Sequence, residues 1–303
     1  MPPSASPPPD SPPPAAVAPT HVAVERLIWR DGVFSPGTRT IPEETPIALT
    51  YGRATHAVMM ATPDDLADFA HGFSLCEGII RGPDDIASLD IVAVPNGVEL
   101  RMDLVAERQD GLTRRQRRIT GPGGCGLCGM DSLAEALRPA RYGTSDARFT
   151  PDEIHAARSL LAGAQRLNAL TRAVHAAAFW TPAEGLVAAR EDAGRHNALD
   201  KLVGAIARSG RDASSGVLLL SSRVSVEMVQ KAAVLGVPVI VAVSAPTALA
   251  VRVAEAANLT LIGVARDDAF EIFTHPARIR PTPVNTGPAN GKMANQGTIR
   301  HVA

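Results

Sequence analysis

Apolar runs alternate with amphipathic stretches along the second half of the chain. The runs at Val217–Leu220 and 237–243 are short and rich in Val, Ile and Leu, which is typical of buried strands. Strands separated by helices usually form a parallel sheet with helices on both faces, so the pattern predicts an α/β fold. Further strands are expected at 176–180, 186–189 and 259–264, and helices at 195–208, 224–235 and 247–257.

The first half of the chain, over residues 21–120, predicts a smaller α/β unit. Two apolar runs, at 91–94 and 98–104, flank Pro95-Asn96-Gly97, a sequence typical of a hairpin turn. Thr62-Pro63-Asp64-Asp65 has the residues of a helix start, with Thr62 as the N-cap and acids near the positive end of the helix dipole. The helix is expected to run through Cys76 toward residue 79.

Both ends of the chain have the composition of unstructured tails. Residues 1–20 contain nine prolines, and 281–303 are rich in Pro, Asn and Gly. Between the tails, Thr150-Pro151-Asp152-Glu153 is a capping box that opens a helix and a larger unit over 150–280. Residues 121–149 are then the connection between the two units.

Composition disfavours several classes of protein. The 30 Lys and Arg residues nearly balance the 31 Asp and Glu residues, and aromatic residues make up 4% of the chain, which disfavours nucleic-acid binding. Three cysteines are too few for a secreted disulfide scaffold, the N-terminus lacks a secretory signal, and no apolar run is long enough to span a bilayer. These features favour a cytoplasmic protein with neither nucleic acid nor membrane as a partner.

The strongest candidate for chemistry is the glycine-rich loop at 121–129, which contains Cys125 and Cys128. Five of its nine residues are glycine, which suits an exposed thiol or a partner that must approach the backbone. The Cys-x-x-Cys spacing favours the thiolate form of the first cysteine, and thiolate is the form that attacks a sulfur donor. The loop therefore indicates Cys125 as a carrier of persulfide sulfur.

Three other interpretations of this loop stay open. The two cysteines could bind zinc with Cys76 and a histidine, act as a thioredoxin-like redox pair, or belong to a structural loop. A dinucleotide-binding loop is excluded because no buried strand precedes it. A zinc nucleobase deaminase is disfavoured because no histidine is followed two positions later by glutamate. Cys76 itself lies on an apolar helix face, which predicts core packing.

A second polar cluster, at 191–201, predicts an anion site. Gly194 would begin a helix whose first turn carries Arg195 and His196, and the amides at a helix N-terminus attract anions. The alternative is a solvated helix start with an internal Asp–Lys pair. Arg223 follows the strand at Val217–Leu220, and ligands of α/β sheets bind at such strand ends. For Arg223 the alternative is a surface cap.

Four segments in this order carry a family resemblance. They are Cys-Gly-Leu-Cys-Gly-Met-Asp-Ser-Leu at 125–133, Glu-Asp-Ala-Gly-Arg-His-Asn-Ala-Leu-Asp-Lys at 191–201, Ser-Ser-Arg-Val-Ser-Val-Glu-Met-Val-Gln-Lys at 221–231 and Phe-Thr-His-Pro at 273–276. Together they resemble the formate dehydrogenase accessory sulfurtransferase family, FdhD, and the resemblance covers about 21–280.

The resemblance implies a fold, an activity and partners. The larger domain would be cytidine-deaminase-like, a three-layer α/β fold without the deaminase zinc, beside a smaller N-terminal α/β domain in a homodimer. Proteins of this family accept sulfur from a cysteine desulfurase. They pass it to the molybdenum cofactor, bis-molybdopterin guanine dinucleotide, before the cofactor enters formate dehydrogenase. Cys125 would carry the persulfide, with Cys128 as its helper.

The resemblance also implies a cofactor-contact segment after the last core strand. It maps to Val264, Ala265, Arg266, Asp267, Asp268 and Ala269. Two acids would repel the phosphates of a guanine nucleotide, so Asp267 and Asp268 are candidates for contacts with the guanine base. The candidates for phosphate contacts are Arg195, His196, Arg223 and Arg266. We therefore expect a sulfurtransferase; a cofactor-binding chaperone without a catalytic cysteine and a thiol oxidoreductase are the alternatives.

Overall fold

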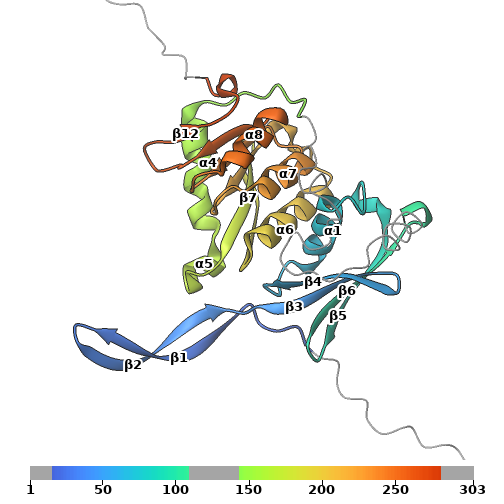
Figure 1. Ribbon diagram of the computed structural model, residues 1–303, viewed down its shortest axis with the longest axis vertical. Helices are drawn as coiled ribbons and strands as arrows, with labels where there is room; N and C mark the ends of the chain where they lie inside the picture. Colours follow the sequence, from blue (N-terminus) through green and yellow to red (C-terminus); the bar gives the residue numbers. More distant parts are fainter. Residues whose placement is uncertain (1–15, 109–142, 281–303) are drawn as a thin grey trace, which may run out of the picture.

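The computed structural model describes residues 16–108 and 143–280 of the 303-residue chain. Two units, each with its own sheet and core, pack together through α1 (Leu66–Cys76) and α6 (Arg195–Arg208), and a hairpin projects from the N-terminal unit (Figure 1). The predictions for Cys125 and Cys128, for the tail at 281–303 and for residues 1–15 of the N-terminal tail concern residues outside the described ranges.

The projecting hairpin consists of β1 (His21–Arg30) and β2 (Val33–Pro42). Asp31 and Gly32 form its turn with φ angles of 52° and 82°, as expected for a two-residue hairpin turn. The sequence pattern did not predict these strands, because Pro36 and Gly37 are residues that rarely occur within strands. Large apolar side chains near the tip are exposed, namely Leu27, Trp29, Val33 and Phe34.

A four-stranded sheet with the order β4-β3-β6-β5 forms the N-terminal unit. Its strands are β3 (Thr45–Tyr51), β4 (Ala54–Ala61), β5 (Ile86–Val94) and β6 (Gly97–Leu104), and the 3-10 helix η1 (Pro83–Asp85) leads into β5. β5 and β6 pair antiparallel on either side of Pro95-Asn96, which confirms the predicted hairpin. Helix α1 packs its Phe69 and Phe73 against this sheet to form the core of the unit.

Helix α1 begins later than the sequence predicts, and Thr62 does not cap it. The helix starts at Leu66, after Asp65 in the left-handed conformation with φ of 52°. The hydroxyl of Thr62 instead accepts a hydrogen bond of 3.1 Å from the backbone N–H of Ala193, in the other unit. The prediction of an N-cap was wrong because a partner distant in sequence occupies the side chain that local reasoning assigned to the helix.

A six-stranded sheet with the order β12-β11-β10-β9-β7-β8 forms the C-terminal unit. Its parallel strands are β9 (Val217–Leu220), β10 (Val239–Ala242) and β11 (Thr260–Gly263), which confirms the predicted parallel arrangement. The antiparallel strands are β7 (His175–Thr181), β8 (Gly185–Asp192) and β12 (Glu271–Ile272). The sheet is therefore mixed rather than wholly parallel.

Helices cover both faces of this sheet and give the unit three layers (Figure 1). α6, α7 (Val226–Leu235) and α8 (Ala248–Ala256) pack on one face, and α4 (Pro151–Ala164) packs on the other. The predicted capping box opens α4: the Thr150 hydroxyl accepts from the N–H of Glu153, whose carboxylate accepts from the N–H of Thr150. The shorter elements are α5 (Arg166–Thr171), η2 (Ala213–Ser215) and η3 (Pro276–Arg278).

No helix in the described ranges combines the length and the apolar character that a membrane crossing requires.

Candidate functional site

The candidate site lies at the edge of the C-terminal sheet where the parallel strands end. The chain leaves β9 at 221–223, β10 at 243–246 and β11 at 264–269. Two contacts join these loops: Val224 bridges to Pro246, and the guanidinium of Arg266 donates to the carbonyl of Val243. The loops that carry Arg223 and Arg266 therefore both contact the loop after β10, and both arginine side chains are exposed.

The turn between β8 and α6 lies at the same edge. Because β7 is antiparallel to both β8 and β9, β8 ends on the side of the sheet where β9 ends. His175, the first residue of β7, pairs there with Asp192, the last residue of β8. The tertiary structure thus places the four candidates for phosphate contacts along one edge of the sheet: Arg195, His196, Arg223 and Arg266.

Helix α6 begins as predicted at Arg195, and no side chain in the described ranges caps it. Its N-cap is Gly194, where a Cβ would approach the Nδ2 of Asn197 to 3.0 Å, so the turn favours glycine. Asp192 is close enough to act as a cap, but its Oδ1 accepts from the N–H of Gly194 at 2.8 Å. The amides of the first helical turn are therefore left to another acceptor, and an anion suits them.

Arg195 adds an unsatisfied donor to this helix start. Its Nε atom is buried, and no described residue accepts a hydrogen bond from it. Leaving a buried donor unpaired is costly, and a phosphate group would satisfy it together with the helix amides. The arrangement therefore fits an anionic ligand better than a purely structural role.

Burial favours the neutral form of the two histidines near this helix start, because it lowers the pKa of each. It lowers the pKa of His196, and the positive charges of Lys231 and Arg195 lower it further. It also lowers the pKa of His175, with Arg195 as the second cause. A bound anion would offset these positive charges, so it would favour protonation of both histidines.

Val264 turns the chain at the end of β11. Its φ of 51° lies in the left-handed region, which a β-branched residue rarely adopts, and such residues cluster at functional sites. After the turn, the N–H of the buried Ala265 donates to Ala242 at 3.1 Å, and the N–H of Arg266 donates to Ala269 at 2.7 Å. The left-handed residue thus folds the expected cofactor-contact segment back over the end of β10.

The two acids of this segment have different surroundings. Asp267 forms an ion pair with Arg158 of α4. Asp268 is exposed, and among the described residues it forms no ion pair. Because the carboxylate of Asp267 is already engaged, Asp268 is the better placed of the two candidates for contacts with a base.

Cys76, the last residue of α1, packs partly buried against the core of the C-terminal unit, which confirms its predicted packing role. Burial raises the pKa of its thiol, and the neighbouring Asp200 raises it further. The described residues contain no group of three or more His, Cys, Asp or Glu side chains that could hold a metal ion. The zinc interpretation of Cys125 and Cys128 concerns residues outside the described ranges and stays a hypothesis.

The start of α6 is not a solvated surface with an internal Asp–Lys pair. Lys201 forms an ion pair of 2.7 Å with Asp192, and both side chains are fully buried. Asp200 pairs instead with Lys231 of α7, at 2.5 Å. That alternative interpretation was therefore wrong: the adjacent Asp200 and Lys201 each pair with a residue of another element.

Sequence reasoning also missed the surroundings of this buried pair. Thr62 and Asn197 hydrogen-bond to the same Asp192 carboxylate, at 3.0 Å each. The sequence did contain one indication: Asn197 and Lys201 are one helical turn apart, so they lie on the same face of α6. Polar residues at that spacing indicate a shared buried partner, but not which residue it is.

Comparison with known proteins gives consistent matches. A family model described as the FdhD/NarQ family matches residues 42–280. The match begins at Pro42, the last residue of β2. Sulfur carrier protein FdhD of Agrobacterium fabrum is 49% identical over 257 residues, covering 84% of this chain and 95% of the relative. The protein of that name from Brucella abortus is 54% identical over 257 residues, covering 84% and 96%. The one from Cupriavidus necator is 47% identical over 263 residues, covering 86% and 91%.

A solved structure shares the fold. It is that of a candidate formate dehydrogenase accessory protein from Desulfotalea psychrophila, with a TM-score of 0.69 and 24% sequence identity. The match covers 86% of this chain and all of that one. The mixed α/β architecture with several sheets is therefore common to both proteins.

Proposed function

Because this chain belongs to the FdhD/NarQ family, we propose that it is a sulfur carrier for formate dehydrogenase that works as a sulfurtransferase. In this proposal it takes sulfur from a cysteine desulfurase as a persulfide on Cys125. It then transfers the sulfur to bis-molybdopterin guanine dinucleotide, which is its substrate, before that cofactor enters formate dehydrogenase. The names of the relatives support the sulfur carrier role.

One observation carries the cofactor half of the proposal: the uncapped start of α6 with the unsatisfied Nε of Arg195. The substrate carries phosphate groups, and helix amides with a guanidinium are the donors that phosphate prefers. His196 lies in the same helical turn, while Arg223 and Arg266 lie on the two loops that contact the loop after β10, at the same sheet edge. We assign phosphate contacts to these four residues.

The remainder of the cofactor segment would contact the nucleoside. Val264, Ala265 and Ala269 supply the backbone of a tight loop, held by hydrogen bonds to β10 and across the loop. Asp268 can accept hydrogen bonds from the N1–H and the exocyclic amine of guanine. We therefore place the guanine base beside Asp268, with Asp267 held by Arg158.

The sulfur half of the proposal rests on the sequence of the cysteine loop. The Cys125 thiolate attacks the terminal sulfur of the desulfurase persulfide, which forms Cys125–S–SH and releases the desulfurase thiolate. Attack by the Cys128 thiolate on Cys125 then expels hydrosulfide and leaves a Cys125–Cys128 disulfide, which a dithiol reductant reopens. Cys128 thus acts as the helper that releases the sulfur.

Mass spectrometry tests the sulfur half. The purified protein is incubated with a cysteine desulfurase and free cysteine, and its intact mass and peptides are measured. We expect added sulfur on the peptide that contains Cys125, removable by reductant, in the wild type and in the matched control Cys76→Ala, but not in Cys125→Ala. Loading of Cys125→Ala to the wild-type level would refute this site.

The leading alternative is a cofactor-binding chaperone in which the cysteines have no role. The anion site favours it as a second candidate, because that site is built without either cysteine of the loop. Formate dehydrogenase maturation distinguishes the two functions. A Cys125→Ala, Cys128→Ala variant that still supports maturation would establish the chaperone and exclude the sulfurtransferase.

We also propose that the protein consists of domains at 21–120 and 150–280 and that the larger domain has the cytidine-deaminase-like fold. The three layers of the C-terminal unit support the cytidine-deaminase-like fold.

We further propose that the protein is a cytoplasmic homodimer. Sedimentation of the full-length protein tests the dimer, and a single species with the mass of one chain would refute it.

A further inference from the structure

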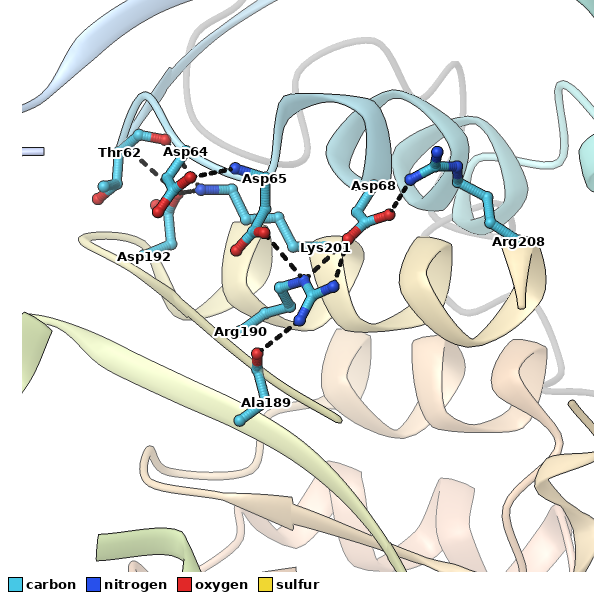
Figure 2. A network of polar contacts seen from close by, with 9 residues as sticks. All are labelled: Thr62, Asp64, Asp65, Asp68, Ala189, Arg190, Asp192, Lys201 and Arg208. Atoms are coloured by element: carbon cyan, nitrogen blue, oxygen red, sulfur yellow. Dashed lines mark hydrogen bonds and ion pairs between the residues drawn. The ribbon is translucent and has the colours of Figure 1, made fainter. Parts of the chain in front are cut away.

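A buried polar cluster joins the N-terminal unit to the start of α6. It consists of Thr62, just after β4, and of Asp192, Asn197 and Lys201 in the C-terminal unit; we call these four residues the Thr62 latch. Thr62, Asp192 and Lys201 have no exposed surface, and Asn197 is 3% exposed. Figure 2 shows Thr62, Asp192 and Lys201 converging where the two units meet.

The carboxylate of Asp192 is the centre of the latch. Its Oδ2 lies 2.7 Å from the Nζ of Lys201 and accepts from the N–H of Thr62 at 3.0 Å. Its Oδ1 accepts from the N–H of Gly194 at 2.8 Å and from the Nδ2 of Asn197 at 3.0 Å. Both oxygens are thus fully engaged, which holds the turn before α6 in one geometry.

The other members of the latch extend toward the N-terminal unit. Lys201 donates to the carbonyl of Thr62 at 2.8 Å, and Asn197 donates to the carbonyl of Met60 at 2.8 Å. In return, the hydroxyl of Thr62 accepts from the N–H of Ala193 at 3.1 Å. The backbone at 193–194 is therefore fixed from one side by its own unit and from the other side by the chain after β4.

This arrangement is a costly way to join two units. A buried ion pair contributes little net stability compared with apolar residues of similar volume, so stability alone does not account for it. Its hydrogen bonds go to the turn, to Thr62 and to Met60, and none of those described goes to the first-turn amides of α6. The latch thus orients the helix start and leaves its anion-binding donors open.

We infer that Thr62, Asp192 and Lys201 are positioning residues for the anion site at the start of α6, so that the N-terminal unit sets the affinity of a site in the other unit. The inference rests on the proposed function, because it assigns the latch to the phosphate site of that function. The latch acts through Gly194 and the first turn of α6, and its own side chains do not touch the ligand.

A second polar cluster between the same two units supplies a matched control. Asp68 of α1 pairs with Arg190 of β8, at 2.6 Å, and with Arg208, the last residue of α6 (Figure 2). Asp68 is 5% exposed, so it is nearly as buried as Asp192. Its contact with α6 is at the far end of that helix, about 20 Å from Arg195 at 1.5 Å per residue.

GDP binding tests the inference, because GDP carries the guanine and phosphates of the substrate. Asp192→Asn disrupts the centre of the latch. Thr62→Val removes only one hydroxyl at nearly constant volume. If Asp192→Asn does not fold, Thr62→Val still tests the inference. We expect each to weaken GDP binding about tenfold, the effect of losing one well-placed hydrogen bond to the turn. Asp68→Asn should lower stability and leave GDP affinity at the wild-type value.

The outcomes separate the positioning role from general damage. Persulfide loading of Cys125 by a desulfurase should be unchanged in Thr62→Val, because that step does not use the anion site. An unchanged GDP affinity in both latch variants, or an equal loss in Asp68→Asn, would overturn the inference and leave the proposed function standing. A wild-type protein that binds no GDP would refute the phosphate site of the proposed function, and the inference with it.

Discussion

Gly72 of α1 and Gly204 of α6 meet at the junction between the two units. A Cβ on Gly72 would lie 1.7 Å from the carbonyl oxygen of Asp200, and a Cβ on Gly204 would lie 1.9 Å from the carbonyl oxygen of Asp68. The two helices therefore pack backbone against backbone, at a distance that only glycine permits. The backbones of α1 and α6 therefore approach each other as closely across the junction between the units as those of two helices packed within one core.

This contact predicts that Gly72→Ala is strongly destabilising. The new methyl group would collide with backbone atoms, which cannot rotate away, so the helices must separate. We expect a loss of about 3 kcal/mol or more in the free energy of unfolding, measured by urea denaturation. Gly163→Ala, in α4 with nothing within 4 Å of the new Cβ, is the control and should gain about 0.5–1 kcal/mol. Equal effects of the two substitutions would contradict the close packing.

The ion pair between Lys231 and Asp200 predicts a large effect of Lys231→Met. Asp200 is 1% exposed, so removing the lysine leaves a buried carboxylate without its counterion. We expect a loss of about 3–5 kcal/mol in the free energy of unfolding. Glu184→Gln, which breaks the exposed pair with Arg211, should change it by about 1 kcal/mol or less. If Lys231→Met lowers the free energy of unfolding by less than Glu184→Gln does, Lys231 does not stabilise the Asp200 carboxylate.

The lowered pKa of His196 predicts a dependence of stability on pH. Burial, Lys231 and Arg195 favour its neutral form in the folded state, whereas Glu227 and Asp200 oppose this. Between the lowered folded pKa and the ordinary value near 6.5, the unfolded chain binds more protons, so stability should fall as the pH falls through this window. His196→Gln should reduce the slope, as measured by denaturation between about pH 5 and pH 7. His21→Gln on the exposed hairpin is the matched control, and an unchanged slope in His196→Gln would exclude His196 as a source.

The different surroundings of Asp267 and Asp268 predict different roles in nucleotide selection. Asp268→Asn replaces a carboxylate that can accept two hydrogen bonds from guanine, so it should reduce the preference for GDP over ADP by about tenfold. Asp267→Asn weakens the pair with Arg158 and should leave the preference unchanged. Calorimetric titration of both nucleotides measures the preference. A loss confined to Asp267→Asn would assign the base contact to Asp267 instead.

Much of the C-terminal unit could be predicted because its signals are local. The apolar run at Val217–Leu220 is a strand with the predicted bounds, and Arg195–Arg208 is a helix with the predicted bounds. The capping box at Thr150 involves residues three positions apart, so its chemistry is visible in the sequence. The β1–β2 hairpin was missed, because Pro36 and Gly37 hide the strand pattern and its exposed face provides no apolar alternation.

The sequence by itself determined the main strands and helices of the C-terminal unit and the chemistry available to them, including a helix that begins with Arg195 and His196. Only the tertiary structure decided which side chains pair. Thr62 and Asp192 are 130 residues apart, and Thr62 and Lys201 are 139 apart, yet they form one buried cluster. Local periodicity depends on neighbours within a few residues, whereas such pairing depends on which elements pack together. For the same reason Thr62, a good helix cap by its sequence, instead holds the start of another helix.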